Sequence, residues 1–320
     1  METAQPCNIL TADAPFNDPT DSVDLVIRTA DNIDFFVLSG LLSLKSPSSF
    51  FRHVLLANQH TEEREGLPVL EVKEDGDTFR IILLLCYPYT SPEIKSIKQL
   101  AEVGTALKKY CMDNALERFV QTVLASSLIR EQPVLVFVHA VANGWKILGE
   151  AAARHKLAIP LVTEAPFKDL KRIDAFQYTS LRYYHILCNI AVQGMPVASS
   201  LPWLKGRESG LLVLHPGVTC QLCGYRLFQT WRIGEQNFTT HSWFGEYLAA
   251  VKGDLSGRPF PELALGKNII ARAAAKSISE CNSTQWPYLV GDQIFAFATL
   301  VAGEIERLIA QVPLNIDWTK

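Results

Sequence analysis

The sequence lacks any uninterrupted apolar run long enough to cross a membrane. Apolar runs such as Val134–Val138 and Ile294–Val301 are far shorter than the roughly 18 residues that a transmembrane helix requires. The N-terminal residues contain acids and prolines but neither a basic start nor an apolar segment of signal-peptide length. We therefore expect an intracellular protein, cytoplasmic or nuclear, with no membrane partner.

A strong excess of charge of either sign is also absent. The chain of 320 residues carries 30 Lys and Arg against 33 Asp and Glu, a net charge of −3. The N-terminal part is acidic and the remainder only weakly basic, with its charges spread along the chain. Because binding to nucleic acid depends on a concentrated basic field, we expect no direct contact with nucleic acid.

The motifs of the common enzyme classes are missing from the sequence. It contains no Gly-rich nucleotide loop, no G-x-S-x-G nucleophile elbow and no H-E-x-x-H pair. His139 lies within an apolar run, where a core histidine is expected more often than a catalytic one. We therefore predict no catalytic residue. Since 48% of the residues are hydrophobic, the chain can bury a sizeable core, which excludes wholesale disorder.

Cysteines are few and odd in number, so the seven thiols cannot all pair. Cys220 and Cys223 form a C-x-x-C pair that could supply two corners of a zinc tetrahedron. Cys281 and either His215 or His241 are the candidates for the remaining ligands. The alternative interpretation is two partly buried thiols in a turn, with no cofactor. A redox role is not expected, because the surrounding pattern is not a thioredoxin-like βαβ unit.

The pattern of elements predicts an α+β domain at the N-terminus. The segment VDLVIRTA alternates like a half-buried strand, IDFFVL is expected to return as its hairpin partner, and LPVLEV predicts a third short strand. Asp77 and Ser96 are the expected N-caps of the helices that follow. We expect a flexible leader over residues 1–19 and a compact domain over residues 20–126.

Beyond this domain the strand signal nearly vanishes. Pro133 is expected to open a helix, Asp174 to cap a longer one, and Pro287 to lie near the start of the last helix. We expect a helical region over residues 127–195. An irregular and helical region that contains the C-x-x-C pair should cover residues 196–320. The aromatic residues of this last region are expected to be core rather than a binding face; they are Trp231, Trp243 and Phe244.

Five segments in this order resemble a BTB/POZ domain over about residues 21–126. They are VDLVIRTADNIDFFV, LLSLKSPSSFFRHVL, LPVLEVKED, IILLLCYPYTSPEI and LKKYCMDNALERFV. The continuation PVLVFVHAVANGWKILGEAAARHKL is similar to that of fungal, basidiomycete-like proteins with this domain. The resemblance implies a short three-stranded sheet with helical hairpins, followed by a mostly α-helical C-terminal region.

The BTB/POZ family is known for protein–protein interaction, and some members dock onto the cullin scaffold of ubiquitin ligases. The resemblance therefore implies a non-catalytic adaptor or scaffold with a protein partner, and it leaves both a cullin and self-association open. The contact positions that it implies are Asp24, Phe35, Phe50, Phe51, Val54 and Tyr87.

Asp24 matches a first-strand carboxylate that, in many family members, faces a histidine and a basic residue in a charged dimer pocket. Leu38 and Ser39 stand at those two positions here. Because an unpaired buried carboxylate is costly, we expect Asp24 to be solvated or capped by another group. The departure removes the basis for expecting the strand-exchanged dimer of the family.

Two hypotheses of other classes remain. One is an enzyme or a zinc-stabilised domain with its site around residues 215–223, where Cys and His residues gather. The other is a transcriptional regulator that acts through a protein partner, because the spacing of a C₂H₂ zinc finger is absent.

Overall fold

The chain forms two compact units, Met1–Ala152 and Ala153–Thr319. The computed structural model describes residues 9–44, 51, 62–88, 91–161, 167–214, 228–280 and 286–319. The boundary between the units falls within helix α8 (Lys146–Lys156). It differs from the expected boundaries after residues 126 and 195, because the helices that follow residue 126 pack onto the first unit.

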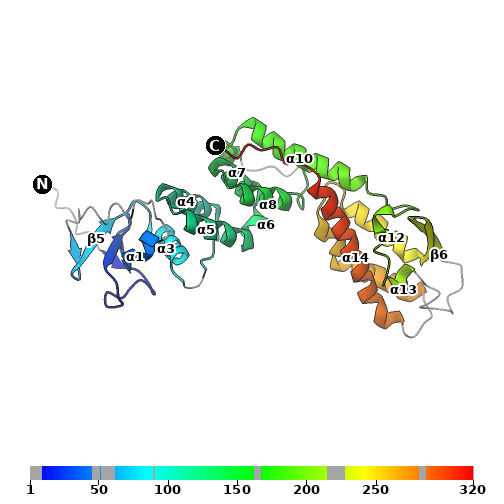
Figure 1. Ribbon diagram of the computed structural model, residues 1–320, viewed down its shortest axis with the longest axis horizontal. Coiled ribbons are helices and arrows are strands. Elements are labelled where there is room, and N and C mark those ends of the chain that lie inside the picture. The colour runs from blue at the N-terminus through cyan, green and yellow to red at the C-terminus, as the bar shows by residue number, and fades with distance from the viewer. Residues whose placement is uncertain are drawn as a thin grey trace. The chain divides into compact units, whose positions relative to one another are not determined.

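The first unit contains a small sheet whose strand order is β1-β3-β2-β5-β4. In that order the strands are Leu10–Thr11, Ile33–Val37, Leu25–Arg28, Leu67–Glu71 and Glu63–Arg64. Strands β2 and β3 form the predicted antiparallel hairpin, and β5 adds in parallel to β2 (Figure 1). The prediction of a mixed α+β fold is confirmed. The two-residue strands β1 and β4 were not predicted.

The expected leader over residues 1–19 is wrong for residues 9–19. Leu10 and Thr11 pair in parallel with the start of β3. Phe16 is buried, and its ring packs edge-on against Tyr87 with 5.2 Å between the ring centroids. The Thr-, Asp- and Pro-rich composition of this segment gave no sign of these contacts. Phe16 is the aromatic residue that packs into the core here, and Arg80 donates to the carbonyls of Asp13 and Ala14.

The helices of the first unit cover the sheet and extend beyond it. They are α1 (Ser39–Leu44), α3 (Gly76–Cys86), α4 (Ile97–Lys109), α5 (Asp113–Ala125), α6 (Leu128–Glu131) and α7 (Pro133–Asn143). Ser96 caps α4 as predicted, accepting the Gln99 N–H at 3.2 Å. Helix α3 begins two residues earlier than predicted, because Asp75, not Asp77, accepts the Thr78 N–H at 2.8 Å.

Trp145 explains why residues 127–152 belong to the first unit. Its buried ring packs edge-on against Phe119 of α5 at 5.7 Å between centroids. The same ring lies over Gly104 of α4, where no side chain intervenes. Helix α7 starts at Pro133, as predicted, and ends at Gly144, whose φ of 75° suits glycine.

The second unit is mostly helical. Its elements are α9 (Phe167–Leu170), α10 (Ala175–Gln193), η1 (Pro202–Leu204), η2 (Leu212–Leu214), β6 (Phe228–Ile233), β7 (Gln236–His241), α12 (Ser242–Asp254), η4 (Pro261–Leu265), α13 (Lys267–Glu280) and α14 (Trp286–Ala310). Asp174 caps α10 through a reciprocal capping box with Gln177, as expected for a strong helix start. Figure 1 shows α14 running beside α13.

The β6–β7 hairpin was not predicted from the sequence. Its strands pair antiparallel, with Ile233 opposite Gln236, so Gly234 and Glu235 form a two-residue turn. Gly234 has a φ of 60°, which a two-residue hairpin turn demands at this position. The sequence signal was present but weak, because β7 is largely polar.

Aromatic side chains fill the core of the second unit. Phe244 stacks on Phe297 of α14 with 4.3 Å between centroids, and Trp231 packs edge-on against Phe244 at 5.3 Å. Trp243 is also buried. The interpretation of Trp231, Trp243 and Phe244 as core rather than a binding face is therefore confirmed.

Helix α14 is long and apolar enough, by length and composition, to cross a membrane. Within its most apolar stretch, 44% of the residues are buried inside the protein. Its buried face includes Phe297, Val301 and Glu304. A core helix of this kind passes the same test of length and composition, so the match is weak evidence for a membrane span.

Candidate protein-interaction groove

Three of the predicted contact residues are core residues. Phe35, Phe51 and Tyr87 are buried. Phe51 packs against Tyr110 with 4.8 Å between ring centroids, and the Tyr87 hydroxyl accepts the Leu38 N–H at 2.7 Å. Their side chains stabilise the fold and do not present a surface to a partner. Two further predicted contact residues, Phe50 and Val54, lie outside the described residues.

Asp24 is exposed and capped, as expected from the missing family partners. Its carboxylate accepts the Ser39 N–H at 2.6 Å and the Ser39 hydroxyl at 2.7 Å. Ser39 is the first residue of α1, so Asp24 supplies an acceptor at a helix N-terminus from a neighbouring strand.

The residues predicted to hold zinc lie outside the described part of the chain. They are Cys220, Cys223, Cys281 and His215. Among the residues that the structure describes, no group of three or more Cys, His, Asp or Glu side chains could hold a metal ion. His241, the further candidate, is buried at the end of β7, and burial lowers its pKa below the ordinary value.

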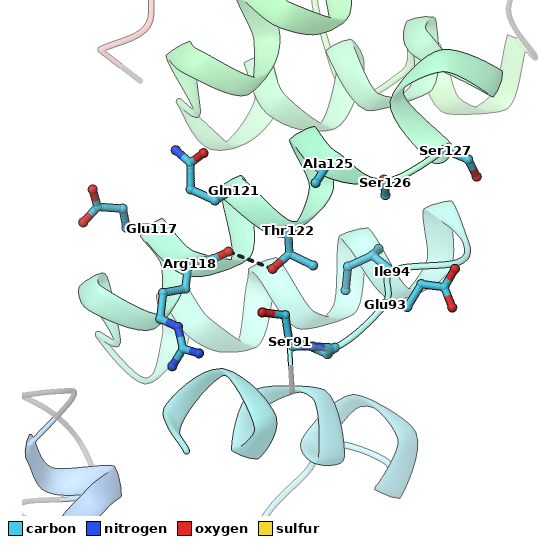
Figure 2. Close-up of a pocket in the computed structure, with 11 residues that line it drawn as sticks. Ser91, Glu93, Ile94, Glu117, Arg118, Gln121, Thr122, Ala125, Ser126 and Ser127 are labelled. Atoms are coloured by element: carbon cyan, nitrogen blue, oxygen red, sulfur yellow. Dashed lines mark hydrogen bonds between the residues drawn. The ribbon is translucent and has the colours of Figure 1, made fainter. Parts of the chain in front are cut away.

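A groove of about 650 Å³ lies between α5 and the segment 91–94 of the first unit (Figure 2). Its lining residues come from the segment before α4, from α5 and from the turn after α5. They are Ser91, Pro92, Glu93, Ile94, Glu117, Arg118, Gln121, Thr122, Ala125, Ser126 and Ser127. Pro92 and Ile94 are buried and form an apolar base, while Glu93, Glu117 and Gln121 are exposed at the rim.

Arg118 joins the groove to the end of α3. Its Nη1 donates to the backbone carbonyl of Leu85 and, at 3.4 Å, to that of Tyr87. A guanidinium at this place satisfies carbonyls that the last turn of a helix leaves without partners. The bonds tie α5 to Tyr87, which the family resemblance marked as a contact position.

Backbone carbonyls accept the protons of two hydroxyl groups in the groove. Thr122 donates to the Arg118 carbonyl at 2.9 Å, as Figure 2 shows, and Ser126 donates to the Val123 carbonyl at 2.7 Å. With their protons used in this way, both hydroxyls face a ligand mainly as acceptors. The lining contains neither His nor Cys. The groove can therefore bind apolar and hydrogen-bonding groups, but its lining offers no pair of nucleophile and histidine base.

A buried ion network was also missed by sequence reasoning. Arg28 forms a bidentate pair with Asp34, at 2.7 Å from Nε and 2.9 Å from Nη2, and Arg64 binds the same carboxylate. Glu62 accepts a further bond from Arg28 at 2.5 Å. The hydrogen bond with Asp34 raises the pKa of Arg28 above its ordinary value. The network joins β2, β3 and β4 and is structural.

No protein-family model and no curated protein matches this chain.

Proposed function

We propose that this protein is a non-catalytic interaction protein, an adaptor or scaffold of the BTB/POZ type. Its first unit would bind a protein partner in the groove between residues 91–94 and α5. The groove carries the proposal, because it combines an apolar base, a polar rim and backbone groups already satisfied by Arg118. Partner surfaces typically combine these features, with about 800 Å² buried on each side.

The arrangement of the first unit supports the family resemblance. A strand hairpin, a third strand parallel to β2, and helices α3, α4 and α5 follow one another in the order that the resemblance implies. The Tyr87-Pro88 pair ends α3, as the fourth of the five resembling segments requires. By contrast, both carboxylate oxygens of Asp24 accept hydrogen bonds from Ser39 of the same chain. This argues against a charged dimer pocket around this carboxylate.

Affinity purification of the tagged full-length protein from its native cells, followed by mass spectrometry, tests the proposed function. A cullin at near-stoichiometric yield supports an adaptor, while another protein or a second copy of this chain supports a scaffold. If no protein partner survives washing at physiological salt, the proposed interaction function is contradicted.

We also propose that the C-x-x-C segment contributes to a structural zinc site in the second unit. The proposal is favoured because described residues that flank the C-x-x-C segment and Cys281 are linked through the end of β7 and the start of α12. Phe228, five residues after Cys223, pairs with His241 at the end of β7. The next residue, Ser242, donates its hydroxyl to Glu280, which directly precedes Cys281.

Helix η2, which ends directly before His215, also contacts β7. Either His215 or His241 therefore completes a Cys₃His set with Cys220, Cys223 and Cys281, a set that zinc accepts. Elemental analysis of protein purified without chelator is expected to give about one zinc per chain, lowered by Cys220→Ser. A zinc content near zero in the wild-type protein contradicts the site.

A further inference from the structure

The outer face of α10 in the second unit is apolar. It exposes Phe176 by 67%, Tyr183 by 55%, Ile186 by 38% and Ile190 by 61%. These residues are seven, three and four positions apart, so they form one stripe along the helix, in which exposed Thr179 stands between Phe176 and Tyr183. At a rise of 1.5 Å per residue the stripe is about 21 Å long.

The inner face of α10 is already occupied. Leu181, Tyr184, His185 and Cys188 on that face are buried. A surface helix normally carries polar residues on its outer side, and a helix that is apolar on both sides is normally covered on both. Single exposed apolar residues need no explanation, but four large ones along one helix face indicate an interaction surface.

Hollows border the stripe at both of its ends. One, of about 180 Å³, lies between Phe176, Tyr183 and the C-terminal residues Pro313 and Asn315. The other, of about 440 Å³, lies beside Ile190 and is bordered on its far side by Trp203 and other residues. Large side chains of a partner could enter both hollows while its backbone follows the stripe.

Positive charge lies beside the stripe. Arg182 is exposed next to Tyr183, and no ion pair joins it to a carboxylate in the described part of the chain. Lys156 is buried, and its Nζ donates to the carbonyls of Ile159 and Pro160 at 3.2 and 2.9 Å. Burial, together with the charge of Arg182, lowers the pKa of Lys156. A complementary partner is therefore acidic at this place.

We propose that the outer face of α10 binds an amphipathic α-helix of another protein. The helix would place apolar side chains along Phe176, Tyr183, Ile186 and Ile190 and a carboxylate opposite Arg182. A membrane surface fits less well, because a helix that lies on a membrane carries many basic residues on its polar face, whereas α10 buries its other face. A second copy also fits less well. Tyr183 is the midpoint of the stripe, so two antiparallel copies would bring both Arg182 side chains together.

Photo-crosslinking in native cells tests this proposal. Full-length protein with p-benzoylphenylalanine in place of Tyr183 is irradiated, and the cross-linked peptides are identified by mass spectrometry. We expect a segment of a different protein, with apolar residues at helical spacing and an acidic residue among them. Arg182→Glu should lower the cross-link yield at least tenfold, whereas Arg182→Lys should retain it.

Four outcomes would overturn the proposal: a cross-link to a second copy of this chain, a cross-link to lipid, no cross-link, or a yield that Arg182→Glu leaves unchanged. Thermal unfolding checks that each variant is folded. Ile147→Glu, at an exposed isoleucine of the first unit, is the matched control and should retain the cross-link. The test is independent of the groove, because Ala125→Arg should also leave this cross-link intact.

Discussion

Ser39 donates both its backbone N–H and its hydroxyl to the carboxylate of Asp24, at 2.6 and 2.7 Å. The two bonds fasten the N-terminus of α1 to the strand hairpin. In many members of the BTB/POZ family proposed for this unit, the carboxylate at this position faces a dimer pocket. Ser39, which stands where many family members have a basic residue, is the residue that hydrogen-bonds this carboxylate.

Asp24→Ala should lower the free energy of unfolding by about 1 kcal/mol, because it removes a cap from a helix N-terminus. Urea denaturation at neutral pH measures the change. Asp21→Ala is the control, since Asp21 is exposed and makes no hydrogen bond or ion pair among the described residues. Equal effects of the two variants would show that the cap contributes nothing.

Asp34→Asn should cost roughly 3–5 kcal/mol of folding free energy, because it leaves the buried Arg28 with only the half-exposed Glu62 as a charge partner. The Asp34 side chain is fully buried and carries the bidentate bond from Arg28. Glu150→Gln, which removes an exposed pair with Lys146 at 3.9 Å, should cost under about 1 kcal/mol. A small loss in Asp34→Asn would mean that the network is not a determinant of stability.

His185 should make the second unit less stable at acid pH. It is buried, with Nε2 at 3.0 Å from the Gly257 carbonyl, and burial lowers its pKa below the ordinary value of 6.5. In this pH range the unfolded chain therefore binds more protons than the folded chain. Its contribution to stability is present above about pH 6.5 and is lost as the pH falls through the pKa of the folded state.

Urea midpoints measured between pH 7.5 and pH 5 should reveal this loss, and His185→Gln should flatten the decline. A decline equally steep in His185→Gln would assign the acid sensitivity to another group. His241 is the alternative, because its pKa is lowered by burial as well.

Gly104→Ala should destabilise the first unit by about 1–3 kcal/mol, although alanine favours a helix over glycine by about 1 kcal/mol. A Cβ at this position would lie 2.1 Å from the ring of Trp145, which is buried against Phe119. Gly303→Ala in α14 is the matched control, because nothing lies within 4 Å of its Cβ position. Chemical denaturation should show a stabilised control, and stabilisation of both variants would exclude the clash.

The parts of the fold that could be predicted are those determined by residues a few positions apart in the sequence. Ser96 and Asp174 cap their helices because each side chain accepts the free N–H three residues later. This bond needs no residue from elsewhere in the chain. The hairpin of β2 and β3 follows from alternation within a few residues. Phe16 and Gly104, in contrast, depend on partners far along the chain, which no local pattern specifies.

The groove could not be predicted for the same reason. Its lining joins a loop to a helix that begins about 20 residues later, and Arg118 acquires its role only through the carbonyls of Leu85 and Tyr87. The family resemblance selected Phe35, Phe51 and Tyr87, whose side chains fill the core. Apolar character alone therefore did not distinguish a residue that contacts a partner from a residue that packs in the core.

The most direct test of the groove compares three forms of the full-length protein in a quantitative affinity purification from native cells. Ala125→Arg fills the groove from an exposed position of α5, whereas Asn114→Arg places the same side chain on that helix outside the lining. The groove predicts that Ala125→Arg lowers partner recovery at least tenfold while Asn114→Arg retains it, with both variants folded. Full recovery by a folded Ala125→Arg variant would contradict binding in this groove.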